Sequence, residues 1–186
     1  MTMFQCHTAQ TAPSASSPML EAASGKFGFV PNLLACLAES PAALKAYLTL
    51  GDIVGSSSLT PKEQNILMLT VSQANDCVYC MSAHTAIAKM ANLDADDISA
   101  LCNDRPLSDA KTEALRNFCQ AIIHKRGWVS PHDVESFLGA GYTRQALLDI
   151  LVVVSMKTLS NYANHIMKTP LDPQFADVKW RSTHAD

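Results

Sequence analysis

The chain has 186 residues, a net charge of −3 at pH 7 and a pI near 6.0, and 48% of its residues are apolar but only 17% charged. This length is sufficient for one domain with a substantial core, and the slightly acidic composition provides no basic footprint for nucleic acid. The small charged fraction predicts that apolar surface is buried between subunits of a homo-oligomer.

Cysteine usage and hydropathy indicate a cytoplasmic protein. Six cysteines at irregular spacing are too few for a disulfide framework, and no basic segment followed by an apolar run opens the sequence as a secretory signal would. The most apolar run, residues 146–156, is interrupted by Asp149 and is too short to span a bilayer. We therefore expect no membrane association.

The N-terminal residues 1–17 are rich in Ser, Thr, Ala and Gln without an apolar period, which predicts a flexible or loosely docked arm. A short helix over 18–24 and a loop over 25–32, with two glycines and a proline, are expected next. Three later positions combine a Ser or Thr cap with a following proline, and they predict helices over 41–54, 61–74 and 131–138.

The rest of the chain also has helical periodicity. Glu63 lies three residues after Thr60 and completes a capping box. Further helices, capped by Asp94, Ser108 and Thr143 where a cap is evident, are predicted over 77–91, 94–101, 108–126 and 143–168. No segment alternates with the period of a strand. The expected fold is all-α: a single domain of about seven or eight helices over 18–175, with a C-terminal tail over 176–186.

The stretch Asn75–His84 contains the most informative motif. Cys77 and Cys80 have C-x-x-C spacing, and His84 follows four residues later, so a helix would place all three side chains on one face. If Asn75 or Asp76 caps this helix, Cys77 lies in its first turn, where free N–H groups and the helix dipole favour a thiolate. His84 would supply a base for the second sulfur.

Three interpretations of this motif are open: a redox dithiol, half of a zinc site with His84 as third ligand, or two unrelated buried thiols. A structural zinc site takes four ligands, and the sequence contains no second Cys or His pair. In the cytosol a C-x-x-C pair is more often catalytic or metal-binding than structural. The residues favour the redox dithiol, without a metal or a cofactor.

The segment L-T-P-K-E at 59–63, followed by T-V-S-Q-A-N-D-C-V-Y-C-M-S-A-H at 70–84, resembles the core of the carboxymuconolactone decarboxylase family. More narrowly it resembles the alkyl hydroperoxidase D (AhpD-like) branch, whose motif N-x-C-x-Y-C-x-x-x-H it matches at each position. The resemblance extends over about 25–175, including F-V-P-N at 29–32 and N-Y-A-N-H at 161–165. It implies an AhpD-like helical bundle, assembly into trimers or hexamers, and a peroxidase that reduces hydroperoxides.

Carried over by position, the resemblance makes Cys80 the peroxidatic cysteine. Cys77 would resolve the sulfenic acid as a Cys77–Cys80 disulfide, and His84 would belong to the proton relay. Physical chemistry agrees, because a peroxide is attacked by a thiolate and the sulfenic acid then needs a neighbouring thiol. A dithiol or a thioredoxin- or lipoyl-type reductant would regenerate the enzyme.

The sequence departs from the family at one relay position. AhpD-like proteins usually have a glutamate twelve residues before the first cysteine, where this chain has Asn65. An amide cannot accept a proton as a carboxylate does, so weak activity or a rerouted relay is expected. Glu63, two residues earlier and on another helix face, and His165, one turn after Asn161, are the other possible relay groups.

Two further functions are compatible with the sequence. The chain could be a redox-sensing or binding scaffold whose disulfide switches a partner surface, or a lyase of the carboxymuconolactone decarboxylase type. Retention of both cysteines weighs against the lyase, because the best-known decarboxylases of the family lack the dithiol. Turnover separates sensor from enzyme, since a sensor oxidises once and stops.

Overall fold

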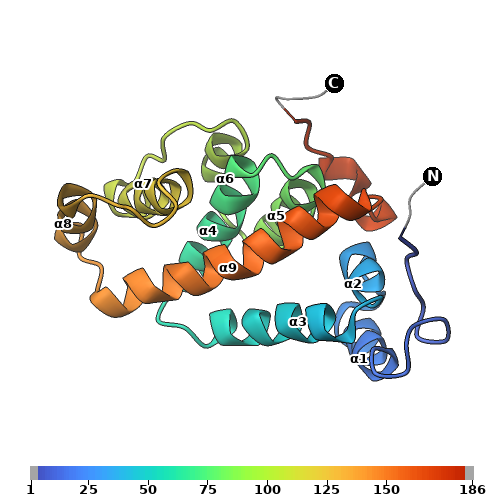
Figure 1. The fold of residues 1–186 in the computed structure, drawn as a ribbon. Coiled ribbons are helices and arrows are strands. Elements are labelled where there is room, and N and C mark those ends of the chain that lie inside the picture. Colours follow the sequence, from blue (N-terminus) through green and yellow to red (C-terminus); the bar gives the residue numbers. More distant parts are fainter. Residues whose placement is uncertain (1–3, 183–186) are drawn as a thin grey trace.

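A long helix, α9 (Arg144–Met167), crosses the molecule and packs against helices on both sides of it (Figure 1). The structure, a computed structural model, describes residues 4–182, and this part of the chain forms helices without any strand. The other elements are α1 (Ser17–Phe27), α2 (Asn32–Leu37), α3 (Pro41–Gly55), α4 (Pro61–Ala74), α5 (Val78–Met90), α6 (Ala95–Cys102), α7 (Ala110–His124), α8 (Pro131–Gly139) and a 3₁₀-helix, η1 (Pro173–Val178).

The all-α prediction is confirmed, but the described residues form nine α-helices where seven or eight were expected. Every helix predicted from the sequence is present, and the addition is α2. It has only six residues, too few for a helical period to stand out, and five of them are buried. Tertiary burial therefore stabilises α2. The 3₁₀-helix η1, which begins at Pro173, was also not expected.

The helix starts follow the capping chemistry in the sequence. The side chains of Ser40, Thr60, Ser130 and Thr143 each accept a hydrogen bond from the N–H three residues later, and Thr60 forms the expected capping box with Glu63. The prediction for α7 was wrong by one residue. Asp109, not Ser108, caps this helix by accepting from the Thr112 N–H.

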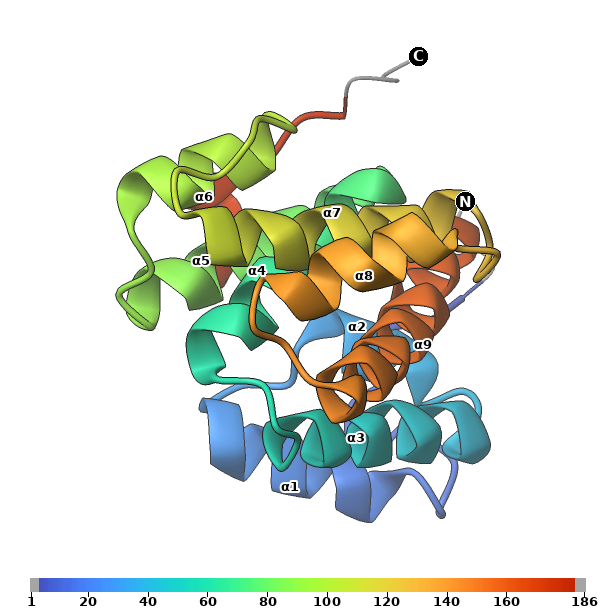
Figure 2. The ribbon, with the colours of Figure 1, turned by 90° about the vertical axis from the view of Figure 1, so that its left-hand side faces the viewer.

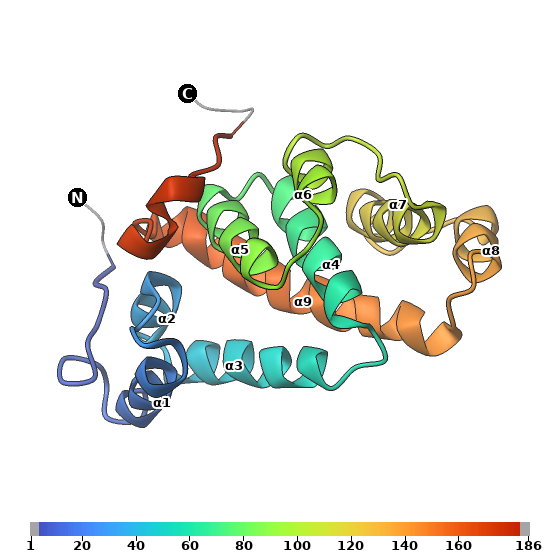
Figure 3. The ribbon, with the colours of Figure 1, turned by 180° about the vertical axis from the view of Figure 1, so that it is seen from behind.

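The helices are arranged in two layers with α9 between them. Helices α1–α3 lie on one side and α4–α8 on the other, as the view along α9 shows (Figure 2). Helix α9 contacts α2 and α3 in the first layer, and α4, α5 and α7 in the second (Figure 3). The hydrophobic core has two parts, a larger one around α4, α7, α8 and α9, and a smaller one around α1, α2, the start of α5 and the end of α9.

Helix α9 is longer than the apolar run at 146–156 suggested. Among the described residues it is the one helix whose length and composition would allow it to cross a membrane. The expectation that no segment is long enough considered only the run at 146–156, which is part of this helix. In this fold it packs against α3 and α4, and its inward face carries the buried side chains of Lys157 and Asn161.

Both ends of the described chain are docked on helices. The segment 4–16 lies against α2, where the His7 N–H donates to Ala35 O (3.0 Å) and Ser16 Oγ to Ala38 O (2.7 Å). At the other end, Trp180 donates its N–H to Ser82 Oγ (3.0 Å) and its Nε1 to Cys102 O (2.8 Å). Residues 1–3 of the predicted arm and 183–186 of the predicted tail lie outside the described residues.

Candidate dithiol site

The turn between α4 and α5 positions the two cysteines. Asp76 takes a left-handed conformation (φ 53°), which Asp adopts more readily than most residues, and Cys77 follows as the N-cap of α5. Cys80 is the third residue of the helix. The prediction that Asn75 or Asp76 caps this helix is therefore wrong, because Cys77 itself occupies the cap position and precedes the first turn.

Both sulfurs lie inside the smaller core. Cys77 and Cys80 are each only 1% exposed and are free thiols in the structure. Asn164 Nδ2 on α9 lies 3.1 Å from Cys80 Sγ and 3.9 Å from Cys77 Sγ. A side chain more than eighty residues later in the sequence thus supplies a hydrogen-bond donor to the dithiol.

Three buried polar side chains of α9 face the dithiol. Lys157, Asn161 and Asn164 follow one another at helical spacing and therefore share one face. Asn161 Oδ1 accepts a hydrogen bond from Asn75 Nδ2 at 2.9 Å, which ties α9 to the turn before Cys77. Within the described part of the chain, Lys157 Nζ and Asn161 Nδ2 have no hydrogen-bond partner of their own. Buried donors of this kind favour a nearby anion.

This environment separates the pKa values of the two thiols. A hydrogen bond from Cys77, the positive charge of Lys157 and the amides of α9 hold the pKa of Cys80 well below its usual value, against the effect of burial. The same hydrogen bond to Cys80, together with burial, raises the pKa of Cys77. Cys80 is therefore the thiolate of the pair, and Cys77 keeps its proton.

His84 lies one turn after Cys80 on α5 and is partly buried. Burial and the charge of Lys157 lower its pKa well below the usual value, so the imidazole is neutral at pH 7. The ring of His84 makes no hydrogen bond to the described residues 4–182. The groups that stabilise the Cys80 thiolate are thus Cys77 and the polar side chains of α9, and His84 is not among them.

The other predicted relay residues are used elsewhere. Asn65 Nδ2 donates to Pro61 O (2.9 Å) within the first turns of α4, and Glu63 accepts from Thr60 in the capping box. Both lie toward the opposite end of α4 from the turn that leads to Cys77. His165 is exposed on α9 and packs against the ring of Tyr162. The structure does not bring these three side chains to the thiols.

Tyr79, between the two cysteines, connects the dithiol helix to the rest of the smaller core. Its hydroxyl donates to Asp172 Oδ2 (2.6 Å) and accepts from the Leu33 N–H (3.1 Å). Asp172 Oδ1 in turn accepts from the Asn32 N–H at 2.9 Å. This network joins α5, α2 and the segment before η1, so Tyr79 fixes the position of the dithiol helix relative to α2.

Sequence reasoning missed four residues close to the thiols: Lys157, Asn161 and Asn164 on α9, and Tyr47 on α3. Lys157 is the one charged residue between Asp149 and His165. A single charge inside an apolar helix is the sequence feature from which its role at the site could have been predicted. Tyr47 on α3 has its pKa raised by burial and by the two cysteines, which places it near them, and nothing in the sequence indicated this. Within 4–182, no group of three or more His, Cys, Asp or Glu side chains is arranged to hold a metal ion.

Comparison with known proteins identifies related chains. Residues 41–122, from α3 into α7, match the model of the carboxymuconolactone decarboxylase family, and this range contains Cys77, Cys80 and His84. No curated protein sequence matches the chain.

Solved structures share the fold over nearly the whole chain. The AhpD-core, peroxidase-related protein from Ralstonia eutropha JMP134 has a TM-score of 0.81 at 22% identity, covering 97% of each chain. A peroxidase-related protein from Silicibacter sp. TM1040 has a TM-score of 0.77 at 22% identity, covering 91% of this chain and 90% of its own. The debrominase Bmp8, a variant of which was solved with 2,3,4-tribromopyrrole, has a TM-score of 0.79 at 15% identity, covering 96% of each chain. At these identities the similarity establishes the AhpD-like fold.

Proposed function

We propose that this chain, whose residues 41–122 match the carboxymuconolactone decarboxylase family and which has the AhpD-like fold, is a thiol-dependent peroxidase acting through Cys77 and Cys80. One observation carries the proposal: the buried Cys80 sulfur accepts a hydrogen bond from Asn164 at 3.1 Å, beside an ammonium group, on Lys157, that has no hydrogen-bond partner among the described residues. This is the environment of a reactive thiolate.

In the proposed reaction the Cys80 thiolate attacks one oxygen of a hydroperoxide and the O–O bond breaks. The alkoxide leaves, takes up a proton and becomes the alcohol, while Cys80 becomes a sulfenic acid. The charge of Lys157 stabilises the thiolate before the reaction and the alkoxide leaving group as the O–O bond breaks.

The second step uses the proton that Cys77 has kept. Its thiol attacks the sulfenic sulfur, the Cys77–Cys80 disulfide forms and water leaves. The neutral imidazole of His84 is suited to accept the Cys77 proton and return it to the departing oxygen. An external dithiol then reduces the disulfide, so that one hydroperoxide and one dithiol give alcohol, water and an oxidised donor.

Burial of the thiols bears on substrate and reductant. Because each sulfur is 1% exposed, a covering side chain has to move before either reagent reaches it. We therefore propose that small hydroperoxides react faster than bulky ones. The reductant is proposed to be a dithiol or a thioredoxin- or lipoyl-type group, and a reduced C-x-x-C pair suits a cytoplasmic location.

Peroxide consumption with a dithiol donor tests the proposal. Cys80→Ser should abolish turnover at this site, whereas Cys77→Ser should slow it, because the Cys80 sulfenic acid then has to be reduced directly by the donor instead of by a neighbouring thiol. Cys119→Ser, at a buried thiol of the larger core, is the matched control and should retain activity. Turnover by Cys80→Ser at the wild-type rate would refute the assignment.

The same assay separates the alternatives. A redox-sensing scaffold would consume one equivalent of peroxide even as the wild-type chain, and a lyase would consume none. A second candidate is reductive debromination, favoured by the structural similarity to Bmp8. Removal of bromine as bromide, with a proton taking its place, also needs two electrons, which the dithiol would supply on forming its disulfide. Bromide release from 2,3,4-tribromopyrrole measures this activity.

We also propose a homo-oligomer, a trimer or hexamer. Helix α9 exposes a row of large apolar side chains at Leu148, Leu151, Tyr162 and Ile166. An exposed apolar patch of this kind is typical of protein interfaces. Light scattering at micromolar concentration should give a multiple of the 20.1 kDa chain mass, and a single-chain mass would contradict the proposal.

A further inference from the structure

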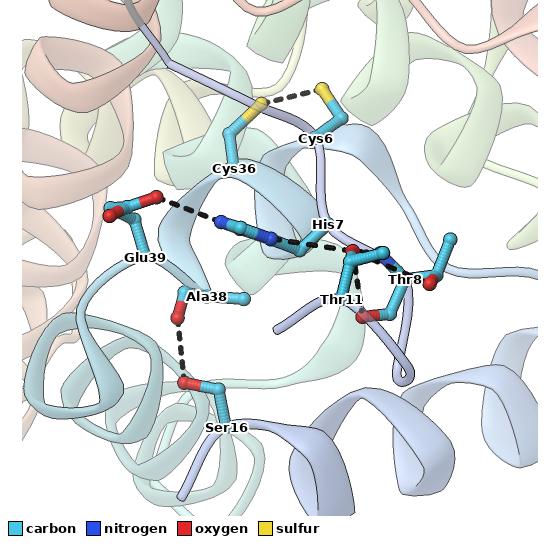
Figure 4. A network of polar contacts seen from close by, with 8 residues as sticks. All are labelled: Cys6, His7, Thr8, Thr11, Ser16, Cys36, Ala38 and Glu39. Atoms are coloured by element: carbon cyan, nitrogen blue, oxygen red, sulfur yellow. Dashed lines mark hydrogen bonds and ion pairs between the residues drawn. The ribbon is translucent and has the colours of Figure 1, made fainter. Parts of the chain in front are cut away.

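A second pair of cysteines lies outside the C-x-x-C motif. Cys6 Sγ and Cys36 Sγ are 2.7 Å apart, although thirty residues separate them in the sequence (Figure 4). Cys36 belongs to α2 and is 2% exposed, whereas Cys6 lies on the N-terminal segment 4–16 and is partly exposed. Neither residue takes part in the activity proposed above.

Polar contacts on both sides of the pair hold the two sulfurs together. The His7 N–H donates to Ala35 O (3.0 Å), and His7 Nε2 lies 2.8 Å from Glu39 Oε2. Ser16 Oγ donates to Ala38 O at 2.7 Å (Figure 4). These contacts fix the N-terminal segment on α2 independently of the redox state of the thiols, so the pair is preorganised to react.

The pair is asymmetric with respect to solvent. A cavity of about 570 Å³ is lined by Cys6, by Asn32 and Ala35 of α2, and by residues of α1 and the N-terminal segment, whereas Cys36 is buried and does not line it. Burial and the hydrogen bond with Cys6 raise the pKa of Cys36 to about 12. Cys36 therefore keeps its proton, and Cys6 is the sulfur that an oxidant meets first.

We propose that Cys6 and Cys36 form a second redox couple, oxidised by hydroperoxides, whose disulfide fastens the segment 4–16 to α2. In the first step the Cys6 thiolate attacks the O–O bond, the alcohol leaves after taking a proton, and Cys6 becomes a sulfenic acid. In the second step the Cys36 thiol attacks that sulfur, the disulfide forms and water leaves. Two thiols supply the two electrons that reduce the hydroperoxide, so the couple does not depend on the Cys77–Cys80 pair.

The bond would close one wall of the compartment that contains the dithiol. Side chains of the N-terminal segment, including Phe4, Cys6 and Ala9, pack against the same small core in which Cys77 and Cys80 lie. A disulfide from Cys6 to α2 restricts the motion of this wall. It is therefore placed to change the access of reagents to the dithiol.

Peptide mapping of the full chain after hydrogen peroxide treatment and trypsin digestion without reductant tests the proposal. Cys6 and Cys36 fall in different tryptic peptides, 1–26 and 27–45, whereas Cys77 and Cys80 share the peptide 63–89. The second couple should appear as 1–26 joined to 27–45. A disulfide of the C-x-x-C pair instead leaves 63–89 as one peptide lighter by two hydrogen atoms, so the two proposals are read separately.

A double variant, Cys77→Ser with Cys80→Ser, makes the result quantitative. Its four remaining thiols should fall to two on peroxide treatment, and the loss should disappear when Cys6→Ser is added but persist when Cys102→Ser is added. The same peptide map of the wild-type chain serves if the double variant does not fold. A wild-type chain in which 1–26 and 27–45 remain unlinked and alkylatable after peroxide overturns the proposal, as does a link from 1–26 to any other peptide.

Discussion

Replacing Asn164 with leucine tests the origin of the Cys80 thiolate, because it keeps the side-chain volume and removes the amide. Asn164 Nδ2 donates to Cys80 Sγ across 3.1 Å, and both side chains are buried. A hydrogen bond to a charged group contributes about 1.5–3 kcal/mol to the charged form. Since about 1.4 kcal/mol is a factor of ten, the thiol–thiolate equilibrium of Cys80 should move about 10- to 150-fold toward the thiol.

The assay is alkylation of Cys80 by iodoacetamide as a function of pH, with the modified sulfur identified by fragmentation of the peptide 63–89. The informative quantity is the pH midpoint of the reaction, because a less stabilised thiolate is also a stronger nucleophile once it has formed. The midpoint should be higher in Asn164→Leu than in wild type. At alkaline pH the variant should react at least as fast as wild type, since Cys80 is then ionised in both proteins.

Two further variants calibrate this result. Lys157→Met removes the buried charge next to the thiols and should move the midpoint in the same direction. His165→Ala changes the exposed neighbour of Asn164 and should leave the midpoint in place. The reasoning is refuted if folded Asn164→Leu titrates with the wild-type midpoint, because the amide would then not stabilise the thiolate.

Three other predictions follow from the same geometry. His84→Gln should leave the Cys80 alkylation midpoint in place, because Cys77 and groups on α9 set it, but should prolong the lifetime of the sulfenic acid detected by a dimedone trap. Tyr79→Phe removes the 2.6 Å hydrogen bond to Asp172 and should lower the free energy of unfolding in urea by about 1.5–3 kcal/mol; an unchanged urea midpoint would contradict this. The fold should lose stability between pH 9 and about pH 12, because burial raises the pKa values of Cys36 and Cys119 to about 12. Their thiols ionise near pH 9.0 when unfolded, so rising pH favours the unfolded chain by about 1.4 kcal/mol per pH unit and thiol, and Cys119→Ala should reduce the slope.

The local features of this protein could be predicted from the sequence because they depend on neighbours in the chain. Helix starts follow from a capping side chain and a proline, as at Thr60 and Ser130, and the apolar period of 3.6 residues identifies the helices. The helical placement of Cys80 and His84 follows from the same periodicity. Helix α2 was missed because its stability comes from burial against distant residues.

The electrostatics of the site depended on tertiary structure. The sequence indicated which residues form the C-x-x-C pair. The pKa order of Cys77 and Cys80 follows from the hydrogen bond between the two sulfurs, and Lys157 and Asn164, about eighty residues later in the chain, further lower the pKa of Cys80. Likewise, Cys6 and Cys36 are unremarkable in sequence and meet only because the N-terminal segment docks on α2. Hydrogen bonds and charge interactions act over a few ångströms in space, so residues far apart in sequence contribute to them only where the fold brings them together.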